Sequence, residues 1–91
     1  MKTCRCSVMG MVQGVGFRFW TVRTASALNL TGWVRNRSDG AVELLACGTE
    51  DAVAALQEKL WEGPPYSRVA QVTCTDALAP DPPCPDFSIQ Y

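Results

Sequence analysis

The chain has 91 residues, 47% of them hydrophobic, with eight basic and nine acidic side chains and a formal net charge of −1 at pH 7. This length suits one domain with a sizeable core, and the balanced charge gives no electrostatic basis for binding nucleic acid. No apolar run is long enough to cross a bilayer and no signal-peptide pattern begins the chain, so we expect a cytoplasmic protein.

The first part of the chain is predicted to form a strand, a turn and a helix. Side chains alternate over residues 3–9, which is typical of a half-buried strand. A glycine-rich turn over residues 10–16 follows. Residues 17 to about 28 are predicted to be helical, although frequent threonine and serine mean that packing must hold this helix. Asn29 suits the left-handed position that ends a helix.

The middle of the chain is predicted to form an antiparallel hairpin. Residues 30–36 and 41–47 have the character of strands, and the dipeptide Asp39-Gly40 favours a tight turn between them. We expect the face of this hairpin that carries Glu43 to be open to solvent.

A second helix and two more strands complete the predicted elements. Thr49 is a suitable N-cap residue for the helix, and Gly63-Pro64-Pro65 ends it. Its buried stripe is predicted to contain Val53, Leu56, Leu60 and Trp61. Strands are predicted over residues 69–77 and 86–91, with a proline-rich loop between them.

This order of elements predicts an α+β fold. A strand, a helix, two strands, a helix and a strand, plus a short terminal strand, make the split βαβ arrangement of the ferredoxin-like sandwich. We expect one antiparallel sheet with two helices on one face, and a single domain over residues 1–91.

The five cysteines, at positions 4, 6, 47, 74 and 84, leave at least one thiol unpaired in a monomer. The spacing Cys4-x-Cys6 differs from the two-residue spacing of zinc and redox motifs. We therefore interpret the cysteines mainly as small buried hydrophobic residues. A bridge from Cys47 to Cys4 or Cys6 would have to cross the sheet, so none is expected.

The absence of histidine limits the chemistry that this chain can perform. It excludes a Ser-His-Asp triad and a Cys-His pair, and it removes the commonest transition-metal ligand. We expect neither a metal nor another cofactor.

The stretch from Gly10 to Arg18 contains the parts of a small anion site. Gly14 and Gly16 free the backbone to turn and to expose its amides, and an arginine follows at the predicted start of a helix. The same pattern also fits a tight turn with an incidental arginine. It is neither a Walker A loop nor a dinucleotide fingerprint, so a single phosphoryl group is favoured over a nucleotide.

A second polar cluster surrounds Asn36, at the end of a predicted strand. An asparagine before a turn commonly bonds its own backbone, and Asp39 is most simply a turn residue. Taken alone, Arg35 and Arg37 are more often solvated residues than ligands.

Two strings of this sequence resemble the signatures of the acylphosphatase family. The first is Val8-x-Gly10-x-Val12-Gln13-Gly14-Val15-x-Phe17-Arg18. The second is Gly32-Trp33-Val34-Arg35-Asn36, followed by Gly40-x-Val42 and then Gly48. They occur in the right order and at the right distance, and the resemblance extends over nearly the whole chain.

The resemblance implies a small stand-alone acylphosphatase, which hydrolyses the carboxyl–phosphate bond of acyl phosphates to a carboxylate and inorganic phosphate without a metal. By the family's pattern, Arg18 and Asn36 are catalytic: Arg18 binds the phosphoryl oxygens and Asn36 orients the attacking water. The implied phosphate-binding residues are Gln13, Gly14, Val15, Gly16, Phe17 and Arg18. The expected partner is a small-molecule acyl phosphate, with no nucleic acid or membrane, and we expect a monomer.

Three positions depart from the family's pattern. Met11 stands where an arginine is frequent, which removes one positive charge near the site. Asn29 replaces a glycine that is usual at the helix end. Some bacterial members join the first strand to the position of Cys47 by a disulfide, but the matching residue here is Thr3, so that bridge should be absent.

Three other functions remain open. A phosphate- or carboxylate-binding module without catalysis could use the same fold and the same turn. An acylphosphatase-like domain also occurs in a larger carbamoyl-phosphate-processing hydrogenase maturation protein, but the length of this chain argues against that context. An RNA-binding sheet would require basic charge and exposed sheet aromatics, which this sequence lacks.

Overall fold

The computed structural model describes all residues from Met1 to Tyr91. Its elements are, in chain order, β1 (Lys2–Met11), α1 (Phe17–Ala27), β2 (Thr31–Asn36), β3 (Val42–Gly48), α2 (Glu50–Leu60), β4 (Arg68–Asp76) and β5 (Phe87–Ile89). Every predicted helix and strand is present, with ends that differ by a few residues. β1 is longer than predicted because it continues through Gly10, where its register against β4 shifts. None of the helices is long and apolar enough to span a bilayer.

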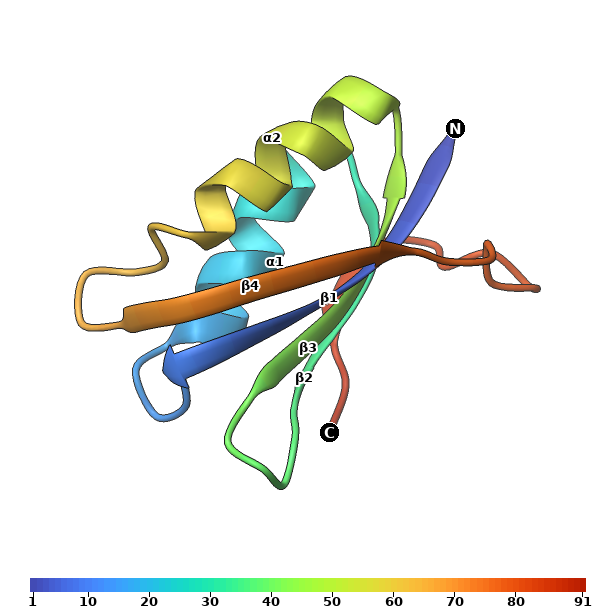
Figure 1. The fold of residues 1–91 in the computed structure, drawn as a ribbon. Coiled ribbons are helices and arrows are strands. Elements are labelled where there is room, and N and C mark those ends of the chain that lie inside the picture. The colour runs from blue at the N-terminus through green and yellow to red at the C-terminus, as the bar shows by residue number, and fades with distance from the viewer.

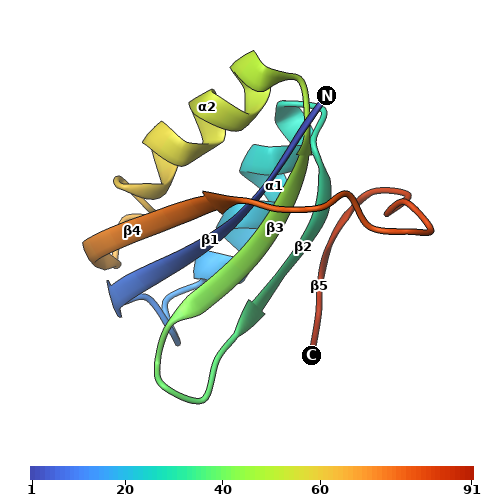
Figure 2. The same cartoon turned by 45° about the vertical axis from the view of Figure 1, so that its right-hand side comes forward.

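The strands form one sheet in the order β4-β1-β3-β2-β5, and both helices pack on the same face of it (Figures 1 and 2). This confirms the predicted ferredoxin-like class. One pairing differs from the expected antiparallel sheet, because β5 runs parallel to β2 and makes the sheet mixed. β4 ends beside the start of β1, at the same end of the sheet as the start of β2. The chain enters β5 from this end of the sheet, where β2 also begins, so the two strands run in the same direction.

The core lies between the helices and the inner face of the sheet. Cys4, Cys6 and Val8 of β1 are buried there, as the alternation predicts, together with residues of β3, α1 and α2. Trp61 is an exception to the predicted stripe of the second helix. It lies just beyond the last turn of α2 and is 53% exposed, so its expected place in the core is wrong.

Both predicted helix signals are confirmed. The hydroxyl of Thr49 accepts a hydrogen bond of 3.2 Å from the backbone N–H of Ala52, which caps α2. Asn29 adopts a left-handed conformation with φ of 59° directly after the end of α1. The chain can therefore turn from α1 into β2.

The second face of the sheet is less open than the sequence suggests. Glu43 and Leu45, on the central strand β3, are only 8% and 6% exposed. Arg35 and Arg5 both pair with Glu43, at 2.7 and 3.9 Å, and both lie over the ring of Trp33, at 5.0 and 5.4 Å from its centroid. The two arginine side chains on the neighbouring strands therefore reach over β3 from both sides and pair with Glu43.

Cys4, Cys6 and Cys47 are buried, as the sequence indicates, but the interpretation of the cysteines as buried hydrophobic residues does not include the disulfide that the structure contains. Cys6 and Cys74 lie directly opposite each other on β1 and β4, and they form a disulfide. Cys6 is therefore not a free thiol, and alternation alone could not show this because it leaves the register of β4 unknown. Cys47 is unbridged, and it accepts a 3.2 Å hydrogen bond from the hydroxyl of Thr3, its partner across β1 and β3.

Candidate active site

One pocket contains both Arg18 and Asn36. It is lined by the turn after β1, the first turn of α1 and the end of β2, through residues Val12, Gly14, Gly16, Phe17, Arg18, Phe19 and Asn36. Its volume is about 90 Å³. This equals the share of about three water molecules in the liquid, so the pocket suits one small anion rather than a nucleotide.

Gly14 and Gly16 set the shape of the turn. Their φ angles are 75° and 79°, and Gly16 is the N-cap of α1. Such left-handed angles are readily adopted by glycine and are costly for most other residues. A Cβ atom at either position would meet no other atom within 4 Å. Backbone conformation, rather than lack of space, therefore favours glycine at both positions. The space beside both glycines is open to a ligand.

The backbone N–H groups at the start of α1 have no hydrogen-bond acceptor within the chain. None of the N–H groups of residues 14–19 donates to an acceptor in the chain, and the first turn of α1 carries neither a capping side chain nor an acidic residue. Caps or carboxylates usually occupy these donors at a helix N-terminus. Here the donors and the positive end of the helix dipole are available to an external anion.

Arg18 has no carboxylate partner. The ion pairs of the chain involve other basic residues, namely Lys2, Arg5, Arg35 and Arg37. Its guanidinium instead lies over the ring of Tyr91, 5.4 Å from the centroid. A ring contacts the face of a guanidinium and leaves the N–H groups at its edge free. Arg18 is therefore held in place while its donors can still bind an anion.

Asn36 is also uncommitted. It is the last residue of β2, and its side chain makes no hydrogen bond within the chain. The turn is stabilised by Asp39 instead, whose carboxylate accepts a hydrogen bond of 3.0 Å from the N–H of Ala41. The expectation that Asp39 is a turn residue is confirmed, and the amide of Asn36 can bind a water or a ligand.

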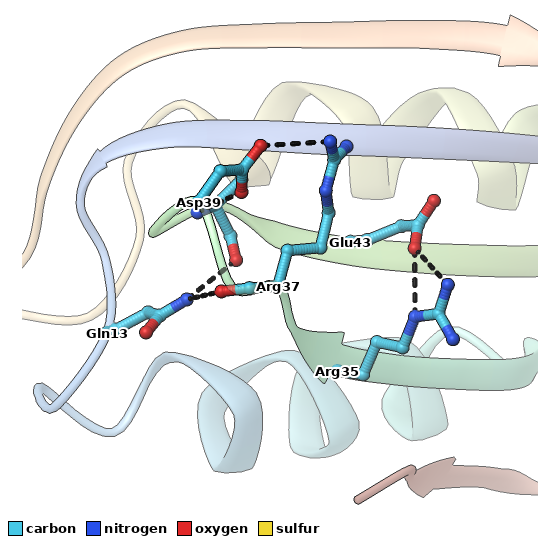
Figure 3. A network of polar contacts seen from close by, with 6 residues as sticks. Gln13, Arg35, Arg37, Asp39 and Glu43 are labelled. Carbon is cyan, nitrogen blue, oxygen red and sulfur yellow. Dashed lines mark hydrogen bonds and ion pairs between the residues drawn. The ribbon is translucent and has the colours of Figure 1, made fainter.

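Gln13 and Val15 stand apart from the other expected phosphate-binding residues, because neither lines the pocket. The side chain of Gln13 points to the β2–β3 hairpin, where its amide nitrogen donates to the carbonyl oxygens of Arg37 and Ala41 at 2.8 and 2.9 Å (Figure 3). Gly14, Gly16, Phe17 and Arg18 do line the pocket.

Sequence reasoning missed two lining residues, Val12 and Phe19. Val12 is buried and directly follows β1. The glycine pattern predicts a binding site in the turn and says nothing about the apolar residue before it. Phe19 is 61% exposed. No signal in the sequence marks Phe19 as a lining residue, because a single exposed apolar side chain is common on protein surfaces.

The arrangement is suited to binding an anion and placing a water beside it. Free amides and a cation can stabilise negative charge on non-bridging oxygens, and Asn36 offers one donor and one acceptor group. The chain contains no cluster of His, Cys, Asp and Glu side chains that could hold a metal ion.

The acylphosphatase family model matches residues 4–89 of the chain. An acylphosphatase of Nitratidesulfovibrio vulgaris is 54% identical over 86 residues, which cover 93% of this chain and 86% of that protein. The structure is similar to that of an acylphosphatase from Coxiella burnetii, with a TM-score of 0.92 and 43% identity over 98% of this chain and 92% of the other. It is also similar to an acylphosphatase from Bacillus subtilis, with a TM-score of 0.93 and 41% identity over 100% of both chains.

Proposed function

Because this chain belongs to the acylphosphatase family, we propose that the pocket between α1 and β2 hydrolyses acyl phosphates to a carboxylate and inorganic phosphate without a metal. The observation that supports this most is the shared pocket of Arg18 and Asn36, next to unsatisfied helix donors. Phosphoryl transfer requires mainly positioning and charge stabilisation, and these groups provide both.

Arg18 and the amides of the turn bind the phosphoryl oxygens in this mechanism. The guanidinium donates two hydrogen bonds to two oxygens, and the amides stabilise charge that builds on the equatorial oxygens. The acyl carboxylate is a stable leaving group, so no strong acid is needed to protonate it.

Asn36 holds the attacking water in line with the bond that breaks. Its amide has no pKa in a useful range, so it orients the water by hydrogen bonding and does not remove a proton. The water oxygen bonds to phosphorus, the bond from phosphorus to the acyl oxygen breaks, and the proton of the water passes to a phosphate oxygen of the substrate.

Release of phosphate from acetyl phosphate and benzoyl phosphate in excess EDTA tests this proposal. We expect turnover, with inorganic phosphate and sulfate as competitive inhibitors because they occupy the same pocket. Folded protein that binds phosphate without turnover would instead be a binding module without catalysis. Turnover that EDTA abolishes and a divalent metal restores would contradict the metal-free mechanism.

We also propose that the protein acts as a cytoplasmic monomer with one domain over residues 1–91, on small-molecule substrates and without nucleic acid or membrane partners. The formal net charge of −1 supports the part of this proposal that concerns nucleic acid and anionic membranes, because it favours no polyanionic partner. Sedimentation velocity over a range of concentrations, with and without duplex DNA or anionic vesicles, tests it.

A further inference from the structure

Gln13 makes the hydrogen bonds that join the two halves of the pocket. Residues 12–16 carry the anion-binding turn, and residues 36–41 carry Asn36 and the loop of the hairpin. No other hydrogen bond in the chain joins these two segments. We propose that Gln13 is a positioning residue, which fixes Asn36 relative to the anion-binding turn, and that its side chain is not a phosphate ligand.

The sheet itself does not hold these segments together. β3 lies between β1 and β2, and the pairing of β1 with β3 ends at Val8 and Val42. Beyond that pair, β1 continues along β4 only, as far as Met11. The turn and the hairpin therefore diverge at the end of the sheet where the pocket lies.

The two acceptors of Gln13 flank Asn36 closely in structure. Arg37 follows Asn36 in the chain, and Ala41 precedes Val42, which is paired with Asn36. The N–H of Arg37 also donates to the carbonyl oxygen of Ala41, at 2.8 Å, so the two acceptors already close the hairpin loop. One amide group thus binds both ends of the hairpin loop, directly beyond the paired residues Asn36 and Val42. Figure 3 shows the side chain of Gln13 pointing to this loop.

The Gln13 amide is well suited to this task and poorly suited to binding phosphate. Both hydrogen bonds come from its nitrogen, which has two donors, so its donor capacity is used. Its remaining group is a carbonyl oxygen, which repels an anion. Val12 and Gly14, its neighbours in the chain, both line the pocket, so a shift of Gln13 would move the turn against Asn36.

This inference rests on the proposed function, so it is tested by kinetics and by a measurement without turnover. Gln13→Met keeps the length of the side chain and removes both donors. Gln71→Met makes the same change on the exposed face of β4, where the side chain has no hydrogen bond, and is the matched control. For Gln13→Met we expect kcat to fall about 10- to 100-fold, since small misplacement of reacting groups has effects of that size.

The inhibition constant of inorganic phosphate separates the two possible roles. If Gln13 positions Asn36, this constant changes less than about 3-fold in Gln13→Met, because Arg18 and the free amides remain. A parallel rise in KM and in the phosphate inhibition constant, with kcat unchanged, would show that Gln13 binds the phosphoryl group. Equal kinetics for Gln13→Met and Gln71→Met would also overturn the proposal.

Gln13→Glu adds a readout that a purely structural role would not affect. A carboxylate cannot donate to the two carbonyl groups, but a protonated carboxyl group can donate to one of them. The ratio of kcat for Gln13→Glu to kcat for the unmodified protein should therefore rise as the pH falls from 7 to about 4, near the ordinary pKa of glutamic acid. The same ratio for Gln13→Met should stay constant, and a constant ratio for both variants would count against the proposal.

A titration with inorganic phosphate, followed by amide NMR, does not depend on turnover. In the unmodified protein and in Gln71→Met, phosphate should shift the signals of residues 36–41 together with those of the turn. In Gln13→Met, the shifts in the hairpin should be largely lost while those of the turn persist. Retained hairpin shifts would overturn the proposed coupling, whereas absent turnover in the unmodified protein would overturn only the proposed hydrolysis.

Discussion

Arg18 and Asn36 line the same pocket although they lie on α1 and β2, and neither makes a hydrogen bond or ion pair with another side chain. The two residues are thus held in place by the backbone and by packing, and their polar groups are free before a ligand arrives. Such preorganisation reduces the rearrangement that binding and reaction require. It also means that their roles can be separated by mutation.

Replacing Arg18 is expected to weaken anion binding and catalysis together. Arg18→Gln removes the positive charge and the paired donors, so kcat/KM should fall about 100- to 1,000-fold, and the inhibition constant of phosphate should rise. Arg23→Gln, on the exposed side of the same helix, is the matched control and should keep the original kinetics. An Arg18→Gln variant with unchanged phosphate inhibition would place the anion elsewhere.

Replacing Asn36 is expected to affect the rate but not the binding of phosphate. Asn36→Ala removes the group proposed to hold water, so kcat should fall about 100-fold, with a nearly unchanged phosphate inhibition constant. Ser38→Ala, in the exposed loop of the same hairpin, serves as the control. Full activity of Asn36→Ala would show that the water is positioned by another group.

The disulfide between Cys6 and Cys74 should contribute measurably to stability. It joins β1 to the edge strand β4 across a sequence separation of 68 residues, and the chain-entropy model gives about 4 kcal/mol for such a loop. Urea unfolding of the oxidised protein should therefore show a higher midpoint than unfolding in a strong reductant. The double variant Cys6→Ala and Cys74→Ala should unfold at the same midpoint with and without reductant.

The buried thiol of Cys4 should make the folded protein less stable at alkaline pH. Burial raises the pKa of Cys4 in the folded protein above its ordinary value of 9.0. As the pH rises through 9.0, the unfolded chain releases this proton while the folded protein retains it, so the free energy of unfolding falls. The melting temperature should thus decrease more steeply between pH 8 and 10 than in a Cys4→Ala variant. Equal slopes would show that Cys4 titrates normally.

Much of the fold could be predicted because local signals agreed with it. Alternation placed Cys4, Cys6 and Val8 in the core, and Asn29 and Thr49 marked helix ends correctly. The pairings between distant strands could not be obtained in this way. The direction of β5, the position of Cys74 opposite Cys6 and the cover over Glu43 all depend on registers that no local pattern encodes.

The candidate site could also be predicted only in part. The motifs predicted that the turn, Arg18 and Asn36 belong to one site, and one pocket contains residues of all three. The side-chain partners of Gln13 and the ring of Tyr91 over Arg18 could not be predicted, because both depend on how separate segments meet at one end of the sheet. Phe19 and Val12 line the pocket because they flank the turn in space. Both are apolar, so the polar motifs of the sequence did not include them.

The contact between Tyr91 and Arg18 matters for how this protein is handled. Tyr91 follows β5 to the end of the sheet that carries the pocket, whereas Met1 lies at the opposite end of β1 (Figure 1). A purification tag, fluorophore or surface linker attached after Tyr91 would lie next to Arg18 and its proposed anion site. The same group attached before Met1 would lie at the other end of the sheet, so assays and immobilisation should use the N-terminal side.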